Sequence, residues 1–266
     1  VKNLHIAGVK NARHSYGHRF LSDGKISFES ANKKHYLATL KKQHVVLDQI
    51  VPVVGRTERE ALILSQLDSI AEQYGLSKKK RDTNLAKTVA NMVEEPYVFK
   101  GDFKREYLSV PQDVLSASMK KHQKVFACYD KKGRIVNQFV AVLNGKRQAR
   151  SMKQIKKDFE NVLEARLRDA QFFYQEDTKT SLADKAEQLK GIVFLGKLGT
   201  LYDKIKRLEQ YCSGVEEALH LSLNAQERER LARAVLLSKA DLVSHMVYEF
   251  PELQGDIGRV YAEYDG

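Results

Sequence analysis

The chain has 266 residues, of which 42% are hydrophobic and 30% are charged, and its formal net charge is +11. This length suits two domains or one large one. No apolar run approaches the roughly 18 residues that a membrane-spanning helix needs, so the composition favours a soluble protein and excludes a membrane-spanning one.

The two ends of the sequence are expected to be cuts in a longer protein. The chain begins at Val1 without a Met and without a signal-peptide pattern. It stops at Asp265-Gly266, directly after a predicted helix.

The first part of the chain predicts short strands that alternate with helices. We expect strands over 4–9, 25–28 and 44–47, and a helix over 30–41 with Ser30 as its N-cap. Pro52 and Gly55 then break the chain. A helix over 57–74 follows from apolar residues at helical spacing, and its start carries a capping box made by Thr57 and Glu60. Asp82 is expected to cap the next helix, which continues to about residue 91.

From Pro96 the pattern becomes rich in β-branched and aromatic residues. We expect strands over 97–100, 106–110, 125–130 and 134–143, and a short helix over 111–121. Lys131-Lys132-Gly133 separates the last two strands and predicts a hairpin turn.

From Ser151 the pattern is almost entirely helical, including one long helix over 231–250. We therefore predict an α+β protein with three parts. They are an α/β domain over 1–150, a helical connector over 151–190 and a helical domain over 191–266.

Charge is divided unevenly between the halves. Residues 1–150 carry 28 Lys and Arg against 14 Asp and Glu, whereas residues 151–266 carry 17 against 20. A basic half suggests contact with a polyanion, and RNA is the natural candidate; dispersed lysines that serve only solubility are the alternative. Candidate RNA contacts lie in predicted loops and element ends: Arg13, His18, Arg19, Lys78, Lys79, Lys80, Arg81, Lys120, Lys121, Lys124, Lys146, Arg147 and Arg150. Lys131, Lys132 and Arg134 form a further basic cluster.

Few residues suggest catalysis or metal binding. Cys128 and Cys212 are the only cysteines, and we interpret both as reduced, buried thiols rather than zinc ligands. His14 and His18 are four residues apart but lack an evident third ligand. The chain has no phosphate-binding glycine loop of the GxxxxGK[ST] type, no HExxH and no GxSxG. We therefore expect no catalytic residue and no metal site in this chain.

Five motifs follow one another along the chain. They are Gly17-His18-Arg19-Phe20, residues 118–129 (SMKKHQKVFACY), residues 165–173 (ARLRDAQFF), Leu198-Gly199-Thr200-Leu201 with Asp203-Lys204, and residues 236–255 (LLSKADLVSHMVYEFPELQG). In this order, and from about residue 3 to 264, they resemble the bacterial glycyl-tRNA synthetase β subunit family. Departures at Glu164-Ala165 and Asp256-Ile257 indicate a divergent member.

The resemblance implies a role in a class II aminoacyl-tRNA synthetase with an α2β2 assembly. In that family the α subunit forms glycyl-adenylate with ATP and Mg²⁺, and the β subunit is needed for tRNA(Gly) binding and charging. The resemblance also implies that residues 1–150 are similar to the editing module of phenylalanyl-tRNA synthetase β chains. Residues 191–266 would form an incomplete HD-like helical domain, without the anticodon-binding domain. The segment would be cytoplasmic, with no cofactor of its own and no membrane partner.

Two alternatives stay open. A hydrolase could retain an editing activity in the first half or an HD-type metal activity in the second. In the HD fold a His-Asp pair follows the leucines of the core helix, but here Ser238-Lys239 follows them, and a lysine would oppose a metal ion. A purely architectural segment is the other alternative. Arg166, Asp169 and Asp203 are expected to be structural, because charged residues beside apolar faces usually tie helices together.

Overall fold

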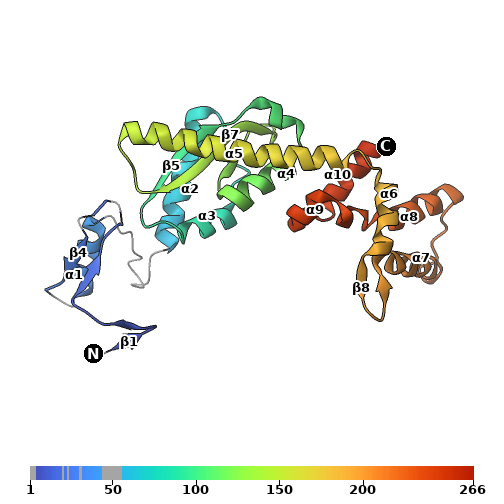
Figure 1. Ribbon diagram of the computed structural model, residues 1–266, viewed down its shortest axis with the longest axis horizontal. Helices are drawn as coiled ribbons and strands as arrows, with labels where there is room; N and C mark the ends of the chain where they lie inside the picture. The colour runs from blue at the N-terminus through green and yellow to red at the C-terminus, as the bar shows by residue number, and fades with distance from the viewer. Residues whose placement is uncertain (1–3, 20, 23, 30–31, 44–55) are drawn as a thin grey trace. The chain divides into compact units, whose positions relative to one another are not determined.

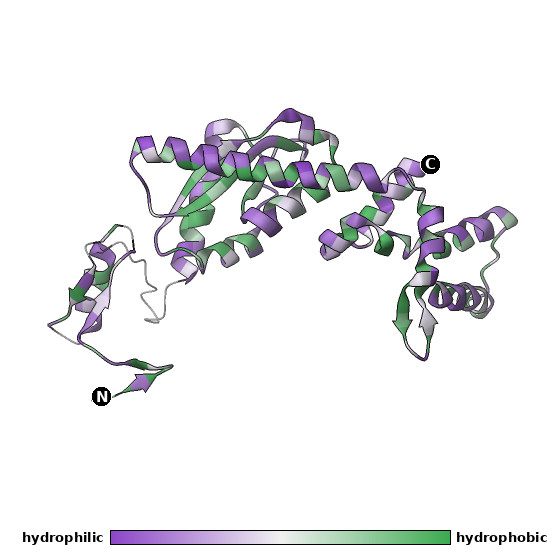
Figure 2. Cartoon of the chain, viewed as in Figure 1, coloured by the Kyte–Doolittle hydropathy of each residue, from purple (hydrophilic) through white to green (hydrophobic). Residues whose placement is uncertain are grey.

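The computed structural model describes residues 4–19, 21–22, 24–29, 32–43 and 56–266. It contains helices and small antiparallel sheets (Figure 1), which confirms the prediction of a mixed α and β protein. Many helices show one hydrophilic and one hydrophobic side (Figure 2), as expected where one face is buried. Within the described part of the chain, no helix has both the length and the apolar character that crossing a bilayer requires.

The chain forms two compact units. The first comprises Val1–Phe103 and Gln123–Val162, and the second comprises Lys104–His122 and Leu163–Gly266. Residues 104–122 therefore belong with the later part of the chain, although they precede residue 150. The predicted boundaries near 150 and 190 stay predictions.

In its described residues, the first unit contains three separate small sheets and four helical segments. Its elements are β1 (His5–Ile6), β2 (Val9–Lys10), β3 (His14–Tyr16), β4 (Lys25–Ser27), α1 (Lys33–Lys42), α2 (Arg56–Tyr74), α3 (Thr83–Ala90), β5 (Pro96–Asp102), β6 (Phe126–Tyr129), β7 (Ile135–Asn144) and the start of α5 (Ala149–Asp177). Strands β1 and β2 pair with each other, as do β3 and β4, and the largest sheet has the antiparallel order β5-β7-β6.

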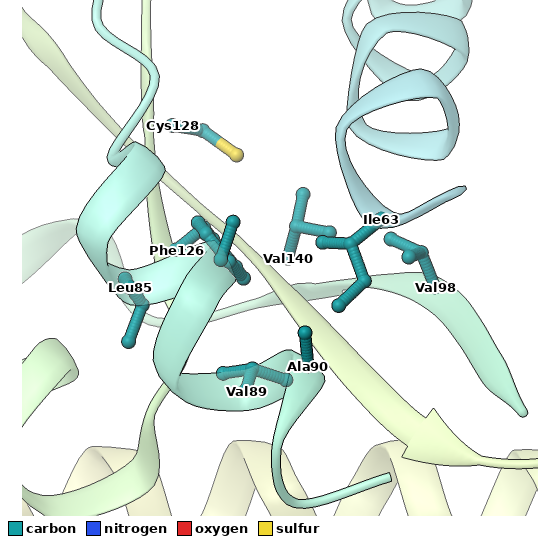
Figure 3. Packing of buried hydrophobic residues seen from close by; sticks show 9 residues of the cluster. Ile63, Leu85, Val89, Ala90, Val98, Phe126, Cys128 and Val140 are labelled. Carbon is teal, nitrogen blue, oxygen red and sulfur yellow. The ribbon is translucent and has the colours of Figure 1, made fainter. Parts of the chain in front are cut away.

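The core of the first unit lies between this largest sheet and the helices α2 and α3. Figure 3 shows how Ile63 of α2 and Leu85 and Val89 of α3 pack with side chains from all three strands. Because side chains alternate along a strand, Val98 faces this core while its neighbour Phe99 points the other way. Phe99 meets Phe159 of α5 edge to face, with 5.3 Å between the ring centroids. The sheet is therefore covered on both faces.

The second unit is mainly helical. Besides the rest of α5 it contains η1 (Arg105–Ser109), α4 (Gln112–Ser118), the π-helical turn η2 (Met119–Gln123), α6 (Leu182–Gln188), η3 (Leu189–Gly191), β8 (Val193–Leu195), β9 (Gly199–Thr200), α7 (Leu201–Ala218), α8 (Ala225–Leu237), η4 (Ala240–Val243), α9 (His245–Glu249), η5 (Pro251–Leu253) and α10 (Asp256–Asp265). On α5, Leu163, Leu167 and Ala170 are buried at helical spacing, so this face forms part of the unit's core.

A buried carboxylate organises the second unit. Asp177 is 3% exposed and lies at the end of α5. It accepts hydrogen bonds from the backbone N–H groups of His245 and Met246, both at 2.9 Å, and from the hydroxyl of Tyr261 at 2.8 Å. Burial, and then the Asp177 carboxylate, raises the pKa of Tyr261, so this hydroxyl stays protonated and donates. One side chain thus joins α5, the start of α9 and α10.

Most predicted elements of the first half are present. The strands near 25–28, 97–100, 125–130 and 134–143 are confirmed as β4, β5, β6 and β7, and the turn at 131–133 is confirmed. The helix at 30–41 is present as α1, but Asn32 caps it rather than Ser30, which lies outside the described residues. Asp82 caps α3 as predicted. The predicted strand at 44–47 and the breaks at Pro52 and Gly55 also lie outside the described residues.

Four predictions about elements are wrong. Residues 4–9 form a hairpin instead of one strand, because Gly8 has a positive φ of 78° and turns the chain. Thr57 lies inside α2 and does not cap it. The predicted strand over 106–110 is instead the 3-10 turn η1, Arg105–Ser109, followed by the extended Val110. The long helix over 231–250 is instead divided into α8, η4 and α9.

Candidate nucleic-acid interface

Two basic loops that are distant in the sequence meet in the first unit. The Nζ of Lys80, in the loop between α2 and α3, donates to the carbonyl of Gly133 in the β6–β7 turn at 3.0 Å. The same ammonium group lies 4.8 Å from the ring centroid of Tyr129, and the backbone N–H of Ser77 donates to the Tyr129 carbonyl. We call the resulting surface the composite basic surface; it comprises Lys78, Lys79, Lys80, Arg81, Lys131, Lys132 and Arg134.

The local sequence explains why both loops turn sharply. Gly75, with a φ of 67°, follows the end of α2, and Asp82 caps α3. In the hairpin, the Asp130 carboxylate accepts the backbone N–H groups of Lys132 and Arg134, both at 2.9 Å. The hydrogen bond from the Arg134 backbone, followed by that from its guanidinium, holds the pKa of Asp130 below its ordinary value despite some opposing desolvation. The turn therefore keeps a negative charge beneath its lysines.

Acidic neighbours neutralise part of the composite basic surface. Lys78 pairs with Glu72, Arg81 with Asp68, and Arg134 with Asp130. Lys79, Lys131 and Lys132 are exposed. Among the described residues, the ammonium groups of these three lysines make no ion pair. They are therefore the cations of this surface that are best available for an external phosphate.

Basic segments of the first unit also lie close together around His18. His18 is fully buried, and its Nε2 lies 2.7 Å from the Oδ1 of Asn144 at the end of β7. The backbone N–H groups of Glu94 and Glu95 also donate to this oxygen. The oxygen is thereby fixed as an acceptor, so the Nε2 of His18 must carry a proton and donate.

This network has consequences for the predicted contacts of His18 and its neighbours. Contact between the His18 ring and RNA would require the bonds to Asn144 to open, whereas Arg13 and Arg19 are exposed. Gly145 packs so closely beside His18 and Arg147 that a Cβ atom there would lie 3.1 Å from each of them. The segment that carries the predicted cations Lys146, Arg147 and Arg150 therefore starts next to the loop that contains His18. Lys146 lies 5.7 Å from the ring centroid of Tyr97.

The remaining predicted cations occupy other settings. Lys120 and Lys121 belong to η2 in the second unit, where Lys121 donates to a carboxylate oxygen of Glu249 at 2.9 Å. Lys124 has a positive φ of 51° just after this turn. None of these three is part of the composite basic surface. Their RNA contacts stay predictions.

A small cavity of about 150 Å³ lies in the second unit. His122, Arg166, Asp169, Ala170, Phe173, Glu249 and Phe250 line it. Burial, together with Arg166 and Lys121, lowers the pKa of His122, so its ring is neutral near pH 7. The polar side chains largely face one another: His122 lies 3.5 Å from Glu249, and Arg166 lies 3.5 Å from Asp169.

Asp203 has a local role at the start of α7. Its carboxylate accepts the backbone N–H of Thr200 at 2.7 Å, and the Thr200 hydroxyl accepts the backbone N–H of Asp203 at 3.1 Å. This reciprocal pair is a capping box, which fixes the beginning of the helix.

The segment around Ser238-Lys239 links two helices. Ser238 ends α8 and Lys239 precedes η4. The carboxylate of the buried Asp241 accepts the backbone N–H of Gly255 at 2.6 Å. In the described ranges of the chain, no group of three or more His, Cys, Asp or Glu side chains is arranged to hold a metal ion.

Both cysteines are free, but only Cys128 is buried, so the prediction of burial is wrong for the half-buried Cys212. Burial raises the pKa of the Cys128 thiol to about 12. Since the thiolate is the reactive form, we expect Cys128 in the folded protein to react with maleimide at pH 8 about a hundredfold or more slowly than after denaturation. Peptide mass spectrometry would measure this, and equal rates before and after denaturation would contradict the packing of β6.

Comparison with known proteins agrees with the sequence motifs. The model of a family described as "Glycyl-tRNA synthetase beta subunit" matches residues 1–266. The "Glycine--tRNA ligase beta subunit" of Syntrophomonas wolfei is 40% identical over 259 residues, which cover 97% of this chain and 35% of the relative. The proteins of the same name from Ligilactobacillus salivarius and Bacillus subtilis are 41% and 39% identical, over 100% and 98% of this chain and 36% of each relative.

The chain spans about a third of the length of these relatives. The family match nevertheless extends over every residue of the sequence. The chain belongs to the glycyl-tRNA synthetase beta subunit family.

Proposed function

We propose that this chain is a non-catalytic part of a glycine–tRNA ligase β subunit that supports tRNA(Gly) binding and assembly with the α subunit. The observation that carries the RNA part of this proposal is the composite basic surface. Phosphate groups are neutralised by lysine and arginine, and a surface built from two loops offers several such contacts at once. Tyr129, half-buried beneath Lys80, adds an aromatic ring to this surface.

The chemistry of aminoacylation is assigned in this proposal to the α subunit, which uses ATP and Mg²⁺ in an α2β2 enzyme of the cytoplasm. The sequence shows neither a His-Ile-Gly-His signature of the first synthetase class nor an arginine-bearing motif that would mark an adenylate-forming site of the second class. We therefore expect no glycine-dependent ATP–pyrophosphate exchange from this chain alone. Exchange in a preparation free of α subunit would contradict the assignment.

The domain resemblances belong to the same proposal. Residues 1–150 would correspond to an editing-module-like α/β domain, and residues 191–266 to an incomplete HD-like helical domain, joined by a helical connector over 151–190. Retained hydrolysis is the second candidate function, favoured by the polar cavity around His122 and Arg166. The mutual pairing of the charges in this cavity favours the non-catalytic role.

The test replaces the three exposed lysines of the composite basic surface in the complete α and β enzyme. The triple variant Lys79→Glu, Lys131→Glu and Lys132→Glu is expected to bind tRNA(Gly) at least tenfold more weakly at 0.1 M salt. The slope of log affinity against log salt should become shallower by about 2–3, because each of the three lost phosphate contacts removes about 0.7–0.9. Glycine-dependent ATP–pyrophosphate exchange, which needs no tRNA, should be unchanged.

A matched control carries the same change in charge elsewhere in the first unit. Lys41, Lys87 and Lys157 are exposed and lie outside the composite basic surface. Their joint replacement by Glu should weaken tRNA binding less than the first triple variant does. Equal losses in both variants would mean that only the net charge matters, and an unchanged affinity and salt slope in the first variant would refute the RNA role of this surface.

A further inference from the structure

Helices α7 and α8 form a helical hairpin that leaves several apolar residues exposed and others only half-buried. On α7, Leu208, Cys212 and Val215 follow one another at helical spacing, and Leu219 continues this line just beyond the helix. Val215 is 52% exposed, Leu219 is 63% exposed, and Tyr211 beside them is 65% exposed. We call these five residues, together with Leu221 and Leu231, the α7–α8 stripe.

The helix α8 lacks the burial that normally stabilises a helix of its length. None of its 13 residues is buried, and its Leu231 is 37% exposed. Isolated helices of about 12–15 residues are only marginally stable in water, so such a helix depends on packing. Among the described side chains of α7, only Ile205 is fully buried. Both helices therefore need a cover over their apolar sides.

An ion pair holds the two helices in register but leaves the stripe open. The Glu216 carboxylate accepts hydrogen bonds from the Nε and Nη2 atoms of Arg228, at 2.9 and 2.7 Å. The start of α8 also carries Glu227, Glu229 and Arg230, so its charges are mixed in sign. Mixed charges around apolar residues suit a protein partner and give no general attraction for RNA.

We propose that, in the complete β subunit, an amphipathic helix from the part of the subunit outside residues 1–266 covers the α7–α8 stripe. This inference rests on the family membership, because the relatives of the same name are nearly three times as long as this chain. Two packed helices present a groove into which the side-chain ridges of a third helix can fit. A segment of the same chain occupies such a groove at a high effective concentration, so the cover is in place whenever the subunit is folded.

The stripe can be footprinted in the full-length β subunit without its α partner. Val215→Cys and Leu219→Cys introduce thiols on the stripe. Glu217→Cys is the matched control, because residue 217 is exposed and lies two residues from both, hence about 200° around the helix. We expect maleimide to label positions 215 and 219 at least tenfold more slowly than position 217, as read by peptide mass spectrometry.

Hydrogen exchange of the unsubstituted subunit provides a second measurement, which does not depend on whether a cysteine variant folds correctly. The amides of 208–221 should exchange slowly in the β subunit alone, at any protein concentration. Equal labelling of the three cysteines, with fast exchange, would overturn the proposal. Protection that appears only when the α subunit is added would assign the stripe to that subunit, and protection only at high concentration would assign it to a second copy; either result also overturns the proposal. None of these outcomes depends on tRNA, so a failure here is distinct from a failure of the RNA-binding role.

Discussion

Replacing Asp177 with alanine is expected to destabilise the second unit by about 3 kcal/mol or more. The change removes one buried carboxylate and leaves the backbone N–H groups of His245 and Met246 and the hydroxyl of Tyr261 without their acceptor. Each buried donor that loses its partner costs about 1–3 kcal/mol. In thermal unfolding of the full-length subunit, the transition of this unit should fall by on the order of 10 °C.

Asp169→Ala is the matched control for this prediction. Asp169 lies on the same helix α5, but its side chain is 56% exposed and its ion pair with Arg166 is long, at 3.5 Å. An exposed pair of this kind contributes about 0–1 kcal/mol. If Asp177→Ala and Asp169→Ala shifted the transition equally, the carboxylate of Asp177 could not be the link between α5, α9 and α10.

Gly101→Ala is expected to destabilise the first unit by about 2–3 kcal/mol. Gly101 pairs with Phe139 across β5 and β7, and the Phe139 ring covers the glycine. A Cβ atom at position 101 would lie 2.1 Å from the Cζ of this ring, which is fully buried. Chemical denaturation of the full-length subunit, followed by circular dichroism, would measure the loss.

A second substitution separates this steric cause from a general effect of removing glycine. Combining Gly101→Ala with Phe139→Leu should restore about 1 kcal/mol relative to the sum of the two single changes, because the ring that clashes is gone. Gly191→Ala is the control, since nothing lies within 4 Å of a Cβ atom there. Strict additivity of the two single changes would show that the ring does not cause the loss.

Local features of the sequence predicted the sheet and its turn. The run over 134–143 and the Lys131-Lys132-Gly133 turn carry their signals in neighbouring residues, so β6 and β7 could be recognised. The end of α8 could not be recognised from the sequence, because the side chains that shape the following segment do so through contacts with residues farther along the chain. Asp241 accepts the backbone N–H of Gly255, and the Ser244 side chain caps α9. The apolar residues keep helical spacing past the end of α8, so the spacing predicts one continuous helix.

The candidate site was predictable only in part. Lys78–Arg81 and Lys131–Arg134 were recognised as separate basic clusters, but nothing in their spacing indicated that Lys80 reaches Gly133, 53 residues away. Asn144 and Glu94 were missed, because an Asn at a strand end and a Glu in a loop are ordinary residues. Their association with His18, 126 residues from Asn144, arises from tertiary packing alone.

Under the proposed function, in which the composite basic surface binds RNA, the contact of Lys80 with the β6–β7 turn also links RNA affinity to folding. In the unfolded chain the two basic loops are separated by about 50 residues of flexible polymer, so the full set of phosphate contacts exists only in the native state. RNA would therefore act as a ligand of the folded form and raise its stability in proportion to the logarithm of the RNA concentration above the dissociation constant. A destabilising substitution in the hydrophobic core far from any lysine, such as one at Ile63, would then reduce the concentration of binding-competent protein. The apparent RNA affinity would fall although every cation remains in the chain.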